Sequence, residues 1–245
     1  PLPAPPNRNE LVISEISLND FSASGTFAGA QANLTQNANL ADLGVNVIEL
    51  LPVTAPSYNG WGYDPVLQAA PNGSFGWPAN FANLVDAAHD LGIAVILDAV
   101  VNHMAGSAPL RQLDDFTGTN HFTTTEGNPW GLVELNWTDP ALREHILASL
   151  CHWVDAYAVD GFRFDGITSM LYLHHGMNKA FTSYEDYFDE SVDEDALTYL
   201  ALANRLIHHL RPEAVTIAED VSGMPGLAAS QDRGGYGFDY RFAMG

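Results

Sequence analysis

The chain has 245 residues, and 30 acidic residues against nine lysines and arginines give it a formal net charge of −21. Such a surface repels phosphate groups, so nucleic acids and anionic membrane surfaces are excluded as partners. Hydrophobic residues make up 47% of the sequence, which is enough for a packed core. The length suits one large α/β domain or two small ones.

The two ends of the chain suggest a part of a longer protein. Residues 1–10 are rich in proline and predict an extended linker, followed by a catalytic domain over residues 11–245. The sequence starts without Met and stops within an apolar stretch, and neither a signal peptide nor an apolar run of membrane-spanning length is visible. A single cysteine, Cys151, leaves no disulfide framework, so we expect a reducing, cytoplasmic location.

Short apolar segments predict the strands of a parallel sheet. Each is nearly continuous rather than alternating, which is typical of a sheet covered on both faces. The predicted strands span residues 11–16, 45–53, 93–101, 159–165, 214–219 and, as a short sixth, 237–242. Apolar residues at spacings of three and four predict helices around residues 81–88, 142–154 and 197–210.

The regular alternation of strand and helix predicts a parallel α/β fold. We expect a (β/α)8 TIM barrel that is incomplete in this chain, with about strands 1 to 6 present. Residues 104–137, after the third predicted strand, are rich in Gly, Thr, Asn and Pro. A segment of that length without periodicity predicts a long, functional loop insertion.

Acidic residues stand at the ends of three consecutive predicted strands. Asp98 lies near the end of the third strand, Asp165 ends the fourth, and Glu219 ends the fifth. An ionised carboxylate at the end of a buried run is costly unless it is paired or poised for chemistry. Because the carboxyl ends of barrel strands meet on one face, we expect these three acids to form a cluster.

A pair of carboxylates suits glycoside hydrolysis, where one is the nucleophile and the other, with a raised pKa, protonates the leaving oxygen. Arg163 and Asp165 point to the same side of a strand, and a guanidinium favours the ionised carboxylate, so Asp165 is the better nucleophile. Glu219 has no basic neighbour in sequence, which suits the acid. The alternatives are a site for Mg²⁺ or Ca²⁺, or acids that only cap helices.

These strand ends resemble the signatures of the α-amylase family, glycoside hydrolase family 13. Residues 98–103 (DAVVNH) resemble its first signature, residues 161–165 (GFRFD) its second, and residues 217–219 (IAE) its third. The resemblance extends from Leu11 onward. It implies retaining chemistry on α-glucosidic bonds, with Asp165 as nucleophile and Glu219 as general acid/base.

The resemblance also implies a set of substrate-binding positions. His103 and Arg163 correspond to residues around the sugar in the cleaved subsite, and Asp98 to a hydrogen-bonding support. Tyr63 corresponds to a tyrosine that stacks on that sugar, as an aromatic face suits the C–H surface of a pyranose. A packed loop aromatic is the alternative for Tyr63, and the adjoining Trp61 is a further candidate for a sugar platform.

The subgroup within the family is indicated by longer matches. Residues 165–178, 219–226 and 234–240 look like eukaryotic-type glycogen and starch branching enzymes. Residues 61–65 and 136–140 are closer to the trehalohydrolase and isoamylase side of the family. We therefore carry three hypotheses: a 1,4-α-glucan branching enzyme, an α-glucan hydrolase of the debranching or malto-oligosyltrehalose trehalohydrolase type, and a non-catalytic glucan-binding protein.

The resemblance implies no cofactor and an α-1,4-glucan partner such as glycogen, amylose or amylopectin. Asn102 matches an asparagine that often helps to bind Ca²⁺ in amylases, whereas branching enzymes generally lack that ion, so we expect no metal. The family's fourth signature, a His-Asp pair after the seventh strand, is missing from residues 1–245. We expect these residues on their own to be inactive.

Overall fold

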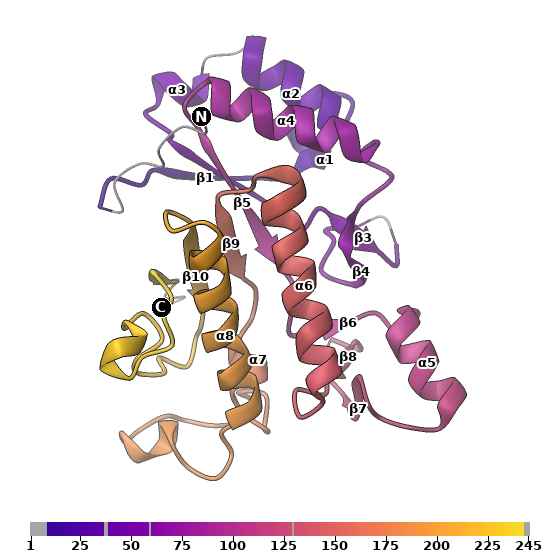
Figure 1. The fold of residues 1–245 in the computed structure, drawn as a ribbon, viewed down its shortest axis with the longest axis vertical. Helices are drawn as coiled ribbons and strands as arrows, with labels where there is room; N and C mark the ends of the chain where they lie inside the picture. The colour runs from indigo at the N-terminus through magenta and orange to yellow at the C-terminus, as the bar shows by residue number, and fades with distance from the viewer. Residues whose placement is uncertain (1–8, 37–38, 59, 129, 243–245) are drawn as a thin grey trace.

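The computed structural model describes residues 9–36, 39–58, 60–128 and 130–242 (Figure 1). The predicted linker over residues 1–10 lies almost entirely outside the described residues. The main sheet of the described chain has six parallel strands, which neighbour one another in chain order. They are β1 (Ile13–Ile16), β2 (Val47–Leu50), β5 (Ala94–Ala99), β9 (Gly161–Phe164), β10 (Val215–Glu219) and β11 (Tyr240–Phe242).

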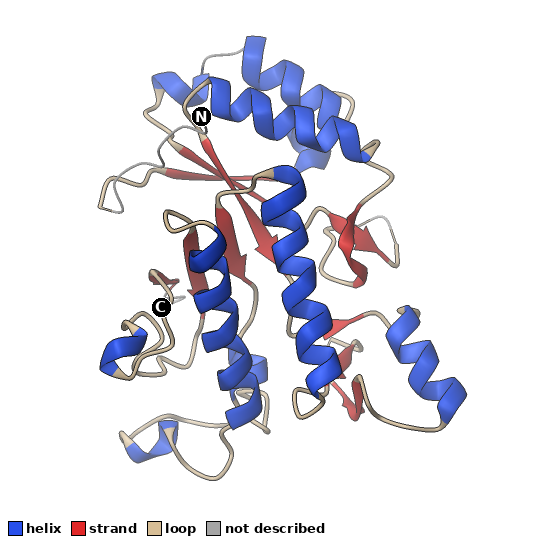
Figure 2. Ribbon diagram, in the orientation of Figure 1, coloured by secondary structure: helices blue, strands red, loops and turns tan. Residues whose placement is uncertain are grey.

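The sheet is curled rather than flat, with its helices on the outside (Figures 1 and 2). Strands that follow in chain order around a curled parallel sheet are the arrangement of a (β/α)8 barrel, so the predicted incomplete barrel is confirmed for the described residues. Each observed strand lies inside its predicted range. The hydrogen-bonded strands are shorter than the apolar segments that predicted them. Residues such as Val45 and Val53 lie outside the paired part of β2, yet their side chains still pack into the large apolar core.

Four long helices cover the outer face: α2 (Phe27–Gln36), α4 (Pro78–Asp90), α6 (Pro140–Tyr157) and α8 (Glu194–Leu210). The last three confirm the predicted helices. α6 begins where the Asp139 carboxylate accepts hydrogen bonds from the first backbone N–H groups, and Asp193 caps α8 in the same way. None of the helices in the described ranges is both long and apolar enough to cross a bilayer.

Helix α2 was not predicted. Its buried side chains are Phe27, Ala30 and Leu34, and the intervening residues are small or polar, so the helical spacing of apolar residues is faint in the sequence. The shorter elements are α1 (Leu18–Phe21), α3 (Asn39–Asp42), β3 (Thr54–Pro56), β4 (Pro65–Pro71), α7 (Thr168–Leu171), η1 (Glu185–Tyr187) and η2 (Gln231–Arg233).

The two faces of the sheet bury separate apolar clusters. Side chains on the inner face of the barrel form a small cluster that contains Val47, Ala94, Ile96, Val215 and Ile217. Their neighbours along the strands point outward into the large core beneath the helices. Because side chains alternate along a strand, this division tells which residues face the barrel interior.

The long insertion predicted after the third strand is present between β5 and α6, but residues 104–137 are folded rather than irregular. It holds α5 (Pro109–Thr117) and an antiparallel sheet of β6 (His103–Met104), β8 (Val133–Leu135) and β7 (Thr123–Gly127). The buried carboxylate of Asp114 accepts hydrogen bonds from the backbone N–H groups of residues 121–123 and from the Thr123 hydroxyl. One buried acid thus organises a segment too polar to show apolar periodicity.

Candidate active site

The three predicted acids lie together at the carboxyl ends of the strands. Asp98 is the second-last residue of β5, Asp165 follows β9 directly, and Glu219 ends β10. Asp98 and Glu219 stand two residues beyond Ile96 and Ile217 of the inner cluster, so their side chains face the barrel interior. The ladder pairs Arg163 with Asp98 on one side and Ile217 on the other, which places Arg163 in the same interior layer.

The Arg163 guanidinium is the centre of this cluster. Its Nη1 lies 2.6 Å from Asp98 Oδ1 and 2.7 Å from Asp165 Oδ1, and its Nη2 lies 2.9 Å from Glu219 Oε2. Its Nε lies 3.9 Å from Oε1 of a fourth acid, Glu49 on β2. One largely buried cation therefore contacts four carboxyl groups. Sequence reasoning missed Glu49, although an acid inside a buried strand was a signal that could have found it.

Burial dominates the electrostatics of the cluster. It raises the pKa of Asp98 and of Asp165 above their ordinary values, although the charge of Arg163 lowers both. The neighbouring Glu219 charge adds to the rise at Asp165. The surrounding acids hold the pKa of Arg163 far above its ordinary value against the effect of burial, so the guanidinium stays charged. Burial raises the pKa of Asp165 to about 6 in spite of Arg163, which leaves the carboxyl group mostly ionised at pH 7, as the role of nucleophile requires.

The environment of Glu219 differs from the prediction. Glu219 has no basic neighbour in sequence, which suited an acid, but in the fold Arg163 reaches it from the adjacent strand. The backbone N–H of Gly166 donates a second hydrogen bond to Glu219 Oε2 at 2.6 Å. Contacts to Arg163 alone thus do not distinguish a nucleophile from an acid, and the assignment of the two roles rests on the order of the signatures.

Tyr63 and His103 extend the cluster at its rim. The Tyr63 hydroxyl donates to Asp98 Oδ2 at 2.7 Å, and His103 Nε2 lies 2.7 Å from the Tyr63 carbonyl oxygen. Burial lowers the pKa of His103, which favours a neutral ring that donates this hydrogen bond from Nε2. Gly62 has a φ of 90°, and a Cβ there would lie 2.7 Å from the Pro52 carbonyl oxygen. Only glycine lets the loop pass so close to the end of β2.

Three tryptophans differ in their exposure and in their distance from the predicted site residues. Trp61 is 70% exposed in the loop that carries Tyr63, and no ring contact joins it to the acids in the described part of the chain. Trp130 is 60% exposed, and its ring centroid lies 5.9 Å from that of His103. Trp137 is instead buried and stacked on Tyr199. Trp130 therefore lies beside a predicted site residue, which no pattern in the sequence indicated.

Asn102 is fully buried beside the cluster. Its Nδ2 donates to the Gly166 carbonyl oxygen and to Ser169 Oγ, both at 3.2 Å, while its Oδ1 has no hydrogen-bond partner. Across the described ranges no group of three or more His, Cys, Asp or Glu side chains is arranged to hold a metal ion. One buried amide oxygen does not make a site for the Ca²⁺ that such an asparagine binds in amylases, and no step proposed below runs through a metal.

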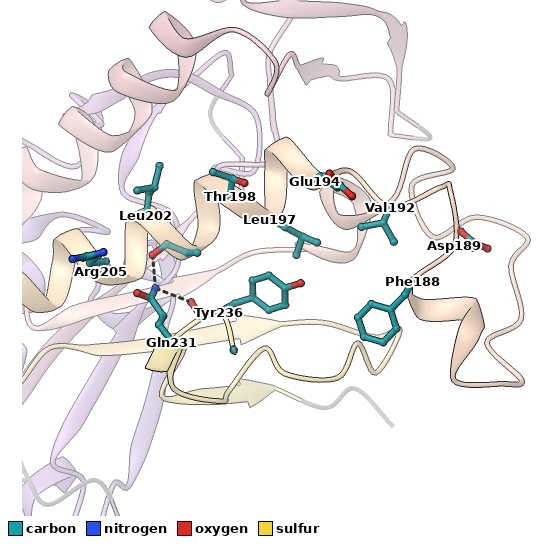
Figure 3. A pocket seen from close by; sticks show the side chains of 12 residues that line it. Phe188, Asp189, Val192, Glu194, Leu197, Thr198, Leu202, Arg205, Gln231 and Tyr236 are labelled. Atoms are coloured by element: carbon teal, nitrogen blue, oxygen red, sulfur yellow. Dashed lines mark hydrogen bonds between the residues drawn. The ribbon is translucent and has the colours of Figure 1, made fainter. Parts of the chain in front are cut away.

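A surface hollow of about 540 Å³ lies apart from the acid cluster, beside α8 (Figure 3). The rings of Phe188 and Tyr236 border it, and Glu194 and Arg205 project from α8 along its other side (Figure 3). None of the four acids around Arg163 lines this hollow. The acid cluster is therefore distinguished by its chemistry and not by the size of a cavity.

The sequence of the chain is similar to those of known proteins. Residues 19–115 match the family model described as the catalytic domain of α-amylase. The chain is 41% identical over 209 residues to the 1,4-α-glucan-branching enzyme of Aspergillus oryzae. The aligned region covers 82% of this chain and 30% of that protein. It is also 41% identical over 211 residues to the 1,4-α-glucan-branching enzyme of Felis catus. That alignment covers 84% of this chain and 30% of the relative.

A solved structure supports the fold. The α-amylase of Lactobacillus plantarum superposes with a TM-score of 0.69 at 24% identity, covering 96% of this chain and 52% of that chain. The chain spans 30% of the length of the two curated relatives. The matched signatures, the parallel barrel strands and these relatives agree, and the chain belongs to the α-amylase family, glycoside hydrolase family 13.

Proposed function

We propose that the protein carrying this chain is a 1,4-α-glucan branching enzyme, which cleaves α-1,4 bonds and forms α-1,6 branches. The observation that carries this proposal is the placement of Asp165 and Glu219 at 2.7 and 2.9 Å from one guanidinium at the carboxyl ends of neighbouring strands. The branching activity in particular is supported by several curated branching enzymes that are 39–41% identical to the chain.

The proposed reaction has two steps, with Asp165 as the nucleophile and Glu219 as the acid/base. In the first step, an Asp165 oxygen attacks the anomeric carbon while Glu219 gives its proton to the departing 4-oxygen, so a covalent glucosyl-enzyme forms. In the second step, the 6-hydroxyl of a glucan attacks that carbon, Glu219 takes the hydroxyl proton, and Asp165 leaves. Protons and charges balance over the cycle, and no cofactor takes part.

The remaining residues of the site position the sugar in this proposal. Arg163 holds the two reacting carboxyls in place, and Asp98 in turn pairs with Arg163 and accepts a hydrogen bond from the Tyr63 hydroxyl. Tyr63 and His103 line the cleaved subsite, with Trp61 as an outer platform. The substrates would be glycogen- or starch-like glucans. A role in glycogen synthesis and a cytoplasmic location belong to the same proposal, and the single Cys151 fits a reducing compartment.

The function is tested by incubating amylose with the full-length protein and measuring two products. A branching enzyme generates new α-1,6 linkages with few new reducing ends, because the glucosyl-enzyme is resolved by a glucan hydroxyl. Many reducing ends without branches would instead assign an α-glucan hydrolase, in line with residues 61–65 and 136–140. If the protein binds glucan but forms neither α-1,6 linkages nor reducing ends, the hypothesis of a non-catalytic glucan-binding protein remains.

A further inference from the structure

Two of the segments that resemble branching enzymes lie against each other beside the reacting acids. Residues 165–178 follow β9 directly, and residues 219–226 begin at the last residue of β10. The first residue of each segment is one of the two acids in the reaction proposed above, and that reaction uses no other side chain of either segment. Buried hydrogen bonds join the residues that come next in the two segments.

The turn that follows Asp165 supplies donors to Glu219. Gly166 has a φ of 52°, and a Cβ there would lie 2.8 Å from the side-chain nitrogen of Asn102, so the turn requires glycine. The Gly166 N–H donates to Glu219 Oε2 at 2.6 Å, and the N–H of Ile167 donates to the Glu219 backbone carbonyl oxygen at 3.1 Å. The turn therefore contacts both the side chain and the backbone of the proposed acid/base.

The hydroxyl group of Thr168 joins this turn to the segment after Glu219. Thr168 is the first residue of α7, and only 7% of it is exposed. Its hydroxyl donates to Asp220 Oδ1 at 2.7 Å and accepts a hydrogen bond from the Val221 N–H at 2.9 Å. One hydroxyl thus acts as donor and as acceptor, and its two partners are the residues directly after the acid/base.

Asp220 gives the Thr168 hydroxyl a partner with a fixed position. No part of Asp220 is exposed. Its carboxylate also accepts hydrogen bonds from the N–H groups of residues 222–224 and from the Ser222 hydroxyl, at 2.7 to 2.9 Å. Arg241 on β11 lies 3.5 Å from Asp220 Oδ2. A buried carboxylate with donors on both oxygens has little freedom to move, so it can hold Thr168 in place.

We infer that Thr168 and Asp220 are positioning residues for Glu219. Their hydrogen bond fixes the turn over residues 166–168, so that the Gly166 N–H stays directed at the carboxyl group of the acid/base. This inference rests on the glycosidic reaction proposed above. A general acid must lie within hydrogen-bond distance of the leaving oxygen, so a small displacement of its carboxyl group slows the reaction without weakening substrate binding.

Valine and serine separate the two groups of the Thr168 side chain. The methyl group lies against Gly176, where a Cβ would come within 2.8 Å of it. Thr168→Val keeps this packing and removes the hydroxyl, whereas Thr168→Ser keeps the hydroxyl and removes the methyl group. In the valine variant Asp220 retains its hydrogen bonds to residues 222–224, so no buried charge is left without a partner.

The experiment measures two reactions of the full-length protein. Amylose needs Glu219 as acid and as base. An α-glucosyl fluoride in the presence of azide needs neither, because fluoride departs without a proton and azide displaces Asp165 without a base. In Thr168→Val we expect kcat on amylose to fall about 30-fold with little change in KM, while fluoride release stays within about threefold of the wild type. In Thr168→Ser both rates should stay within about threefold.

Ser222→Ala is the matched control, because it removes a hydroxyl donor from the same oxygen of Asp220 without touching the turn. Its ratio of the two rates should stay within about twofold of the wild-type ratio. If Thr168→Val slows both reactions equally, the hydroxyl only stabilises the fold. That result would overturn the positioning role, as would unchanged amylose turnover in Thr168→Val or equal losses in the valine and serine variants.

A second measurement does not depend on activity. Hydrogen–deuterium exchange of a peptide that spans residues 162–171 reports on the N–H groups of the turn. In Thr168→Val the N–H groups of Gly166 and Ile167 should exchange at least about tenfold faster than in the wild type, and in Thr168→Ser at the wild-type rate. Unchanged exchange in Thr168→Val would overturn the proposal. If the wild type turns over neither substrate while exchange behaves as expected, the proposed function fails and the role of Thr168 in fixing the turn stands.

Discussion

The two ends of the barrel each bury an arginine with acidic partners, but in opposite proportions. At the amino-terminal end, Asp160 is 2% exposed, and its carboxylate is shared by Arg211, His89 and the backbone N–H of Val95. At the carboxyl-terminal end, the guanidinium of Arg163 is shared by four carboxyl groups. One end has more donors than acids, and the other has more acids than cations.

The difference separates a stabilising cluster from a reactive one. Every donor around Asp160 belongs to a different part of the chain, so the carboxylate ties α4, β5 and the turns before β9 and β10 together. Both of its oxygens accept hydrogen bonds from buried donors of the chain, as in a structural ion pair. The acids around Arg163 are only partly compensated, and the raised pKa values of Glu49, Asp98 and Asp165 show the cost. Chemistry at the carboxyl ends and stability at the amino ends is the usual division in these barrels.

The largest effect should come from Asp165→Asn. Without an ionisable nucleophile the glucosyl-enzyme cannot form, and we expect glucan turnover to fall at least about 1,000-fold. Thermal unfolding should not move to lower temperature, because the change removes one acid from a site that has too many. Turnover close to that of the wild type would show that Asp165 is not the nucleophile.

At the opposite end of the barrel, Asp160→Asn should act on stability. The substitution leaves Arg211 buried without its counter-charge, at a cost of about 3 kcal/mol in the free energy of unfolding. The kcat of the protein that stays folded should remain within about twofold of the wild type. Urea unfolding and kcat are measured on the same preparation. A loss of kcat at unchanged stability would reverse the comparison between the two ends.

Glu49→Gln should change how stability depends on pH. The pKa of Glu49 lies near 7 in the folded chain against its ordinary value of 4.5. Between these two pH values the unfolded chain releases the proton and the folded chain keeps it, so stability falls as pH rises. The variant lacks this contribution and should gain about 2 kcal/mol relative to the wild type between pH 4.5 and 8. Urea unfolding at both pH values measures the gain, and a constant difference would contradict the shift.

The smallest effect should come from an exposed acid, Asp115→Asn on α5. Asp115 pairs with Arg111 one helical turn away, and its side chain is 57% exposed. Water screens such a pair, so the free energy of unfolding should change by less than about 0.5 kcal/mol. This variant is the matched control for Asp160→Asn, because both remove one carboxylate from an arginine. A change as large as that at Asp160 would show that burial is not the cause.

Much of the fold could be predicted because buried parallel strands are short apolar runs. The same pattern did not reveal α2, whose buried face consists of Phe27, Ala30 and Leu34 among small and polar residues. It also did not reveal the sheet of β6, β7 and β8. That sheet depends on hydrogen bonds to the Asp114 carboxylate, and such contacts leave no periodicity in a sequence.

Contacts within the site could be predicted where the residues are neighbours along one strand. Arg163 lies on β9 and Asp165 follows that strand directly, so the alternation of side chains places both on one side. The contact of Arg163 with Glu219 depends on the register between two strands, which the sequence does not state. Glu49 was missed although strand alternation places it in the barrel, because no motif drew attention to it. Trp130 reaches His103 only through the folding of the segment between β7 and β8.

In the proposed reaction Asp165 forms a covalent bond with the sugar while Glu219 serves as acid and base. The most direct test is to incubate the Glu219→Gln variant of the full-length protein with an α-glucosyl fluoride, whose leaving group needs no proton, and to digest the product for mass spectrometry. We expect a hexosyl adduct on the peptide that contains Asp165, because the variant forms the glucosyl-enzyme but lacks the base that resolves it. An adduct on Asp98 or Glu49, or fluoride release at the wild-type rate without any adduct, would contradict the account.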